Sequence, residues 1–122
     1  MNEILIIPIK GLPEVKKGDD LASMTFDQIN KSGNEIKDSD VFVITQKIVS
    51  KSEGMERDLN KYEFEDLIKS ETRQIIRKRG DLIIAKTKHG FICANAGIDK
   101  SNIDKNKALL LPEDPNKSAH KF

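Results

Sequence analysis

Two short apolar runs joined by a turn, at residues 81–86 and 91–94, constrain the fold more than any other feature of the sequence. Each run has the length of a strand, and the turn between them contains Gly90. Consecutive strands separated by so few residues pair with each other as an antiparallel hairpin. The sequence therefore predicts a β-hairpin in this part of the chain.

Polar residues follow the second run at once. A turn with Gly97 comes first, and Asp99, Ser101 and Asn102 come next. Glycine permits a ligand to approach the backbone closely, and carboxylate and amide oxygens suit hard cations such as magnesium. The same residue types are also typical of an ordinary capped turn. From these residues alone, a cation or phosphate site and a plain turn both stay open.

Composition is typical of one domain that covers residues 1–122. With 37% hydrophobic and 34% charged residues and a net charge of +1, the chain has no overall field that would attract nucleic acid or an anionic membrane. The longest apolar runs, such as residues 4–9 and 109–112, are too short to span a bilayer, and no export signal is recognisable at the N-terminus. These features predict a cytoplasmic protein.

Helical spacing of apolar residues occurs in two segments. Residues 21–32 predict a helix with an aspartate as its N-cap. Residues 64–79 predict one longer helix, with acidic residues at its start, basic residues at its end and Gly80 as its stop. Ser118 is a good cap for a further helix at the end of the chain.

Two other segments predict strands. Residues 3–9 are almost all aliphatic, as in a strand covered on both faces, and residues 41–49 are rich in β-branched side chains. Thr45, Gln46 and Lys47 interrupt the second run with polar side chains, which must either face solvent or converge on something polar. Together the segments predict an α/β (mixed α+β) fold with a mixed sheet and flanking helices.

No familiar catalytic or nucleotide-binding motif occurs. The seven glycines form neither G-x-x-x-x-G-K-[ST] nor G-x-G-x-x-G, so a nucleotide site would be neither a P-loop nor a Rossmann site. The single cysteine, Cys93, lies in an apolar run, and the sequence shows no general base at a spacing typical of a cysteine nucleophile. Cys93 is therefore expected to be a small core residue. For His89, in the hairpin turn, a hydrogen-bonded loop residue and a functional residue both stay open.

Four blocks of sequence, in this order, resemble one known family. They are GLPEVKKGDDLA (11–22), DVFVITQKIVSKSEG (40–54), RKRGDLIIAKTKHGFICANAGIDKSN (77–102) and LLLPEDPNKSA (109–119). Together they resemble the coenzyme F420-0:L-glutamate ligase family, also called γ-glutamyl ligase. The resemblance spans essentially the whole chain. Family chains are longer, so this chain resembles their N-terminal half.

The resemblance implies an enzyme that adds L-glutamate to the deazaflavin precursor of coenzyme F420 with GTP as co-substrate. Magnesium or manganese is the implied divalent cofactor, and a monovalent cation is an additional candidate. The implied mechanism transfers the terminal phosphoryl group of GTP to a carboxylate, and the glutamate amine then attacks the acyl phosphate. Family members form intertwined homodimers with a mixed α/β fold unrelated to P-loop proteins.

The resemblance also implies site residues. The family's guanine-nucleotide contacts fall on Leu12, Pro13, Glu14, Val15, Gln46, Lys47, Lys51 and Asn102. Small hydroxyl residues also occur in the family at the positions of Gln46 and Lys47. Asp99 matches the first metal-ligating aspartate. The family's other metal ligands lie in a later segment, around a D-T-x-G-R type motif that this sequence does not contain, and no catalytic residue is assigned.

Two alternative hypotheses follow from that difference. A non-catalytic nucleotide- or cofactor-binding module would bind GTP without glutamylation. A half-subunit that needs a separate C-terminal partner would expose apolar surface in isolation. The sequence leaves open whether the chain is a fragment, a split half or a short homologue, whether it acts alone, how many glutamates are added and which metal is preferred.

Overall fold

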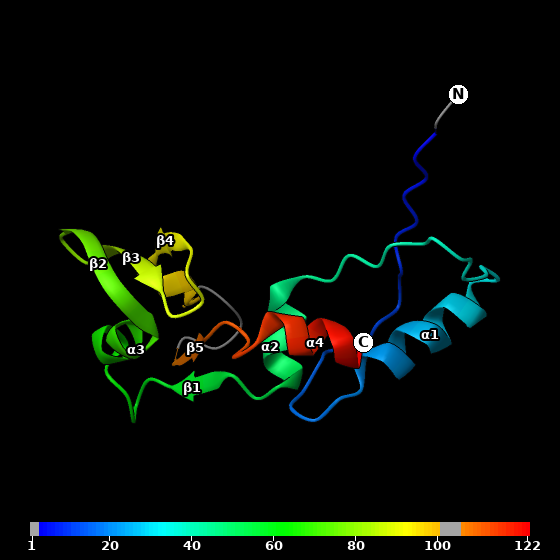
Figure 1. Cartoon of the computed structure of the whole chain (residues 1–122). Helices are drawn as coiled ribbons and strands as arrows, with labels where there is room; N and C mark the ends of the chain where they lie inside the picture. The colour runs from blue at the N-terminus through cyan, green and yellow to red at the C-terminus, as the bar shows by residue number, and fades with distance from the viewer. Residues whose placement is uncertain (1–2, 101–105) are drawn as a thin grey trace.

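The structure is a computed structural model that describes residues 3–100 and 106–122. Its helices and two small antiparallel sheets confirm the α/β fold class (Figure 1). In chain order the elements are α1 (Leu21–Lys31), α2 (Gln46–Ser52), β1 (Glu56–Asp58), α3 (Phe64–Glu71), β2 (Thr72–Arg79), β3 (Leu82–Thr87), β4 (Ile92–Ala94), the 3₁₀ turn η1 (Asn95–Gly97), β5 (Lys107–Leu109) and α4 (Pro115–Lys121). None of the helices in the described ranges is long and apolar enough to cross a bilayer.

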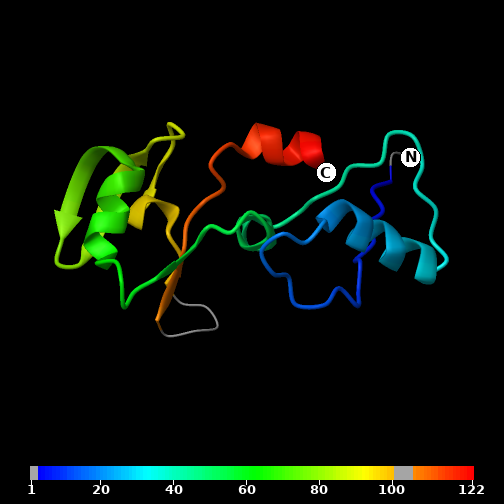
Figure 2. The same ribbon diagram turned by 90° about the horizontal axis from the view of Figure 1, so that it is seen from below.

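The hairpin predicted from the two apolar runs is confirmed. β3 pairs antiparallel with β4, with Ala85 opposite Cys93, and β2 pairs with the other edge of β3. Ile83, Ala85 and Thr87 alternate along β3 and are all buried, as expected for one covered face of a sheet. Both views show α3 beside this sheet (Figures 1 and 2).

One cluster of buried apolar side chains joins α3, β3, η1 and β5. Its members are Leu67, Ile68, Ile83, Ala85, Ala96, Ile98, Ala108 and Leu110. The backbone of η1 packs closely against the Leu111 side chain. Gly97 has φ +74°, and a side chain at that position would collide with Leu111. Asp99 follows two residues later and pairs with Leu109 through backbone hydrogen bonds of 2.9 and 2.8 Å. The core therefore fixes the backbone that carries Asp99.

The second sheet consists of β1 and β5, with Arg57 opposite Ala108. β1 lies within the segment at residues 55–61. The segment is charged and gives no strand signal of its own, but β5 supplies the hydrogen-bonding partner that makes it a strand. This short sheet links the end of α2 to the segment after Asp99.

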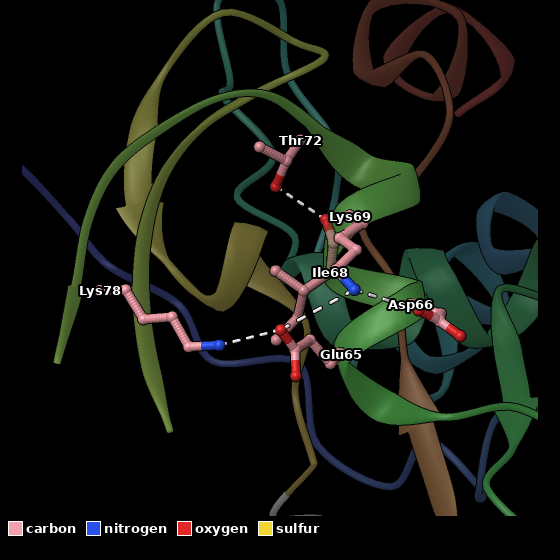
Figure 3. Close-up of polar contacts among 6 residues, drawn as sticks. All are labelled: Glu65, Asp66, Ile68, Lys69, Thr72 and Lys78. Carbon is pink, nitrogen blue, oxygen red and sulfur yellow. Dashed lines mark hydrogen bonds and ion pairs between the residues drawn. The ribbon is translucent and has the colours of Figure 1, made fainter. Parts of the chain in front are cut away.

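The prediction of one helix over residues 64–79 is wrong. The chain leaves the helical conformation at Thr72 and continues as β2, because β3 offers a strand edge and the β-branched residues of this stretch suit a sheet. The Thr72 hydroxyl donates to the Ile68 carbonyl oxygen at 2.7 Å where the helix ends (Figure 3). Farther along, Lys78 Nζ lies 2.9 Å from Glu65 Oε1 and ties β2 back to α3.

The strands predicted at residues 3–9 and 41–49 are also not observed. Residues 3–9 and 41–45 are irregular, and Ile4, Val41 and Val43 have exposed fractions of 91%, 85% and 91%. No strand in the described part of the chain pairs with either segment. An extended segment without a partner cannot satisfy its backbone groups in a sheet. In Figure 1 the N-terminal segment projects away from the helices.

Helix caps account for the two terminal helices. The predicted helix over residues 21–32 is confirmed as α1, and Asp20 caps it by accepting a hydrogen bond from Ser23 N at 3.1 Å. The C-terminal helix begins earlier than predicted, because Asp114 is its cap and a proline occupies its first turn. Ser118 instead lies within α4, where its hydroxyl donates to Glu53 Oε1 at 2.5 Å.

Candidate functional site

The short helix α2 carries three of the predicted site residues. Gln46 and Lys47 were expected on a strand and Lys51 lies beyond its predicted end, so the helix changes their relative positions. Residues four apart on a helix lie on the same face, so Lys47 and Lys51 are neighbours one turn apart. A hydrogen bond of 2.5 Å from Gln46 Nε2 to Ser50 Oγ spans one turn of the same helix. The helix thus gathers two cationic side chains on one side.

Lys47 and Asp99 meet in an ion pair. Lys47 Nζ lies 2.8 Å from Asp99 Oδ2, and the two side chains are 38% and 23% exposed. The β5 segment makes this contact possible, because the hydrogen bonds to Leu109 hold Asp99 beside α2. A residue predicted to bind nucleotide therefore contacts the residue predicted to bind metal.

Lys51 lies beside the predicted turn at residues 12–15. Its Nζ is 3.9 Å from Glu14 Oε1, with the lysine side chain 12% exposed and the glutamate 66% exposed. The separation is long for an ion pair, and the exposed carboxylate is well solvated, so this contact contributes little to stability. The turn and α2 are tied more firmly through the backbone, where Gly18 N donates to Ser52 O at 2.8 Å.

The four residues of that turn have different surroundings. Val15 is buried and Leu12 is partly buried, whereas Pro13 and Glu14 are exposed. Buried apolar side chains on both sides of an exposed pair anchor the turn while leaving its tip open to solvent. The backbone and side chains at the tip are therefore accessible to a ligand beside Lys51.

Gln46 has a structural contact as well as a predicted binding role. Besides its bond to Ser50, its Nε2 lies 3.4 Å from the Leu110 carbonyl oxygen. Ser50 is fully buried, so the Gln46 amide helps to satisfy a hydroxyl inside the protein. The contact connects the start of α2 to the end of β5, close to where Asp99 is held.

The predicted sites are thus only partly assembled in the described residues. The structure brings Lys47 and Asp99 together and, one helical turn along α2, Lys51 near Glu14, whereas Asn102 lies outside the described residues. The sequence analysis did not predict that the backbone of Leu109 would hold Asp99, or that the Leu110 carbonyl oxygen would contact Gln46. The apolar run at residues 109–112 was the available signal, since such a run favours a strand that can pair.

The oxygen ligands that Asp99 offers suit a metal ion that a second ligand also coordinates. Within residues 3–100 and 106–122, no three His, Cys, Asp or Glu side chains gather in a way that could hold a metal ion. Asp99 nevertheless presents a partly exposed carboxylate that already contacts a cationic group. Magnesium commonly takes only one or two carboxylates and completes its coordination with water and substrate phosphates. Asp99 is therefore compatible with a metal bound together with a phosphorylated ligand.

A largely apolar cleft runs along α1, α2 and α4, and sequence reasoning did not anticipate it. Its lining includes Phe26, Phe42, Val49, His89 and Phe122. His89 Nε2 donates to the Pro112 carbonyl oxygen at 2.8 Å, so the interpretation of this histidine as a hydrogen-bonded loop residue is supported. The apolar spacing of α1 was the only sequence signal for the cleft.

Cys93 does not have the surroundings of a nucleophile. It lies partly buried on β4, and burial raises the pKa of its thiol. A reactive cysteine needs the opposite shift, since the thiolate is the attacking species. Cys93 was expected to be a small core residue, but it is only partly buried and is not a member of the core cluster.

Comparison with known proteins places this chain in a family. The family model described as F420-0:Gamma-glutamyl ligase matches residues 10–122. This chain belongs to that family. The match includes the turn at residues 12–15, α2 and Asp99, so the family's sequence pattern and the partly assembled site coincide in one region.

Several relatives carry the name Coenzyme F420:L-glutamate ligase. The chain is 38% identical to the one from Methanothermobacter thermautotrophicus, over 98% of this chain and 54% of that protein. It is 32% identical to the one from Archaeoglobus fulgidus, over 96% and 51%, and 33% identical to the one from Haloarcula marismortui, over 93% and 51%. The chain thus spans about half the length of the curated relatives that it matches.

Proposed function

We propose that this chain forms the nucleotide-binding part of a ligase that adds L-glutamate to the deazaflavin precursor of coenzyme F420, with GTP as co-substrate. Membership of the F420-0:gamma-glutamyl ligase family supports the reaction class. The observation that carries the proposal is the 2.8 Å contact of Lys47 with Asp99, which joins a predicted phosphate contact to a predicted metal ligand. The wider proposal includes an intertwined homodimer and a cytoplasmic location.

The chemistry of amide formation gives these residues their roles. A carboxylate oxygen of the precursor attacks the terminal phosphorus of GTP, and GDP leaves. The glutamate nitrogen then attacks the acyl phosphate carbon, loses a proton and expels phosphate. Lys47 and Lys51 would stabilise the negative charge on the phosphates through charge-assisted hydrogen bonds. Asp99 would hold magnesium or manganese, which supplies further charge neutralisation when bound.

Thermal unfolding with GTP or ATP, each with and without manganese, tests this proposal. We expect a higher unfolding temperature only with GTP and manganese together, because a ligand that binds the folded state alone stabilises it, by about 2.7 kcal/mol at a hundred times its Kd. Asp99→Ala should abolish the shift. Asp81→Ala, which removes an exposed aspartate from the turn between β2 and β3, should retain it. An unchanged unfolding temperature with every ligand would contradict the proposal.

A second candidate function is a half-subunit whose site is completed by a separate chain. Two observations favour it. The chain spans about half of its relatives, and the segments at residues 3–9 and 41–45 expose aliphatic side chains without a strand partner in the described ranges. A non-catalytic module is the outcome if GTP binds but glutamate is never added.

A further inference from the structure

The ion pair between Lys47 and Asp99 places a cation where a metal is proposed to bind. Lys47 Nζ lies 2.8 Å from Asp99 Oδ2, and a magnesium ion bonds to a carboxylate oxygen at about 2.0–2.1 Å. Two cationic centres on one oxygen would lie close together and repel each other. A metal that uses this oxygen must therefore displace the ammonium group.

The surroundings show which partner can move. Asp99 is fixed through its backbone, which exchanges hydrogen bonds of 2.9 and 2.8 Å with Leu109. The Lys47 side chain is 38% exposed and has a long flexible stem in the first turn of α2. Lys51, one turn later on the same face, is only 12% exposed. Of these two lysines, Lys47 is therefore the one that is free to move.

We propose that Lys47 is a built-in counter-ion of Asp99 when no nucleotide is bound and that its ammonium group moves onto the nucleotide phosphates when the metal enters. This inference rests on the proposed function, since it assumes that phosphate and metal share this site. Metal alone has to compete with the lysine for the carboxylate. Metal that arrives with a nucleotide brings phosphates, which give the displaced ammonium a new partner.

The exchange makes metal and nucleotide binding depend on each other. Each ligand removes the cost that Lys47 imposes on the other, so each should raise the affinity of the other by the same factor. Replacing Lys47 should then have two opposite effects. Manganese alone should bind more tightly, and the gain that GTP gives to manganese binding should fall. A merely structural role for Lys47 would not produce effects of opposite sign.

Manganese binding, followed by the electron paramagnetic resonance signal of the unbound ion, tests the inference on the whole chain. For Lys47→Met we expect about two- to fivefold tighter manganese binding without nucleotide, the range that losing one competing ion pair predicts. The enhancement by GTP should be largely lost. Lys47→Thr is a second variant with a smaller side chain, and circular dichroism checks that each variant is folded.

Two other lysines provide matched controls. Lys78 also makes a close ion pair, 2.9 Å from Glu65 on α3, and Lys78→Met should leave manganese binding unchanged. Lys51→Met removes a neighbouring charge without touching the carboxylate of Asp99. Equal gains for Lys51→Met and Lys47→Met would overturn the inference, because general electrostatics would then explain both.

The remaining outcomes separate this inference from the proposed function. If Lys47→Met and the unchanged chain bind manganese equally, while Asp99→Asn abolishes binding, the metal site stands and the exchange is overturned. If manganese binds no variant even when GTP is present, or binds Asp99→Asn as well as the unchanged chain, the proposed function fails and the exchange fails with it. Tighter manganese binding in Lys47→Met that Asp99→Asn reverses in the double variant supports both.

Discussion

At the scale of single residues, Gly97 shows how a local constraint places a functional group. It has φ +74°, and a Cβ there would lie 2.7 Å from Leu111 Cδ1 and 3.0 Å from Leu111 Cγ. Both the backbone conformation and the packing therefore require glycine. Asp99 lies two residues farther along, so the backbone conformation at Gly97 helps to set the position of the Asp99 carboxylate relative to α2.

Gly97→Ala should destabilise the protein markedly. The left-handed conformation costs an alanine about 1–2 kcal/mol, and displacing the Leu111 side chain adds about 1–3 kcal/mol. Urea unfolding measures the change. Gly80→Ala is the matched control, since Gly80 has φ +58° with nothing near its missing Cβ, and it should lose only the conformational part. Equal losses for the two variants would show that packing against Leu111 is unimportant.

At the scale of elements, the aspartate cap predicted for α1 is confirmed, whereas Ser118, the cap predicted for the C-terminal helix, lies inside that helix. Asp20 accepts hydrogen bonds from Ser23 N at 3.1 Å and Ser23 Oγ at 2.8 Å. These bonds, the backbone one first, lower the pKa of the Asp20 carboxyl below 3.8. Its carboxylate therefore stabilises α1 at pH values above 3.8, and this contribution is lost as the pH falls through the lower, folded-state pKa.

Asp20→Asn tests this pH dependence. Asparagine caps a helix about as well as aspartate but does not titrate in this range. The difference in unfolding temperature between the natural chain and the variant should be constant above pH 3.8 and should shift against the natural chain as the pH falls below that value. Asp27→Asn, on the exposed side of α1, corrects for the loss of one charge. A difference that does not change with pH would contradict the assignment.

Strands other than those of the hairpin were hard to predict because a strand depends on a partner elsewhere in the chain. Residues 64–79 have helical spacing, but the second half becomes β2 because β3 lies beside it. Residues 41–49 have strand-like composition, yet the part from Gln46 onward is helical and the rest has no strand partner in the described ranges. Apolar spacing reports local preference, and tertiary contacts override it.

At the scale of the whole molecule, the exposed aliphatic segments are the most unusual feature. Ile4, Leu5 and Ile6 have exposed fractions above 80%, and so do Val41 and Val43. Apolar groups and unpaired backbone at two places in one chain are typical of strands awaiting a partner. The half-subunit hypothesis gives these segments a role that packing within the described residues does not.

Hydrogen exchange tests that hypothesis. We expect residues 3–9 and 41–45 to exchange fast in this chain alone, because their amides have no strand partner among residues 3–100 and 106–122. Adding the C-terminal half of the Methanothermobacter relative, produced as a separate chain, should slow their exchange. β3 is the internal control, since it is already paired on both edges and should be slow throughout. Slow exchange of both segments without any added chain would contradict the hypothesis.

The sequence by itself determined the features that depend on neighbouring residues: the 81–94 hairpin, the capped helix α1 and the family to which the chain belongs. Only the tertiary structure decided that α2 is a helix and that Lys47 reaches Asp99. The physical reason is separation along the chain. Turns and caps arise within a few residues, whereas the ion pair needs β5 to hold Asp99 beside α2, and no local pattern specifies that contact.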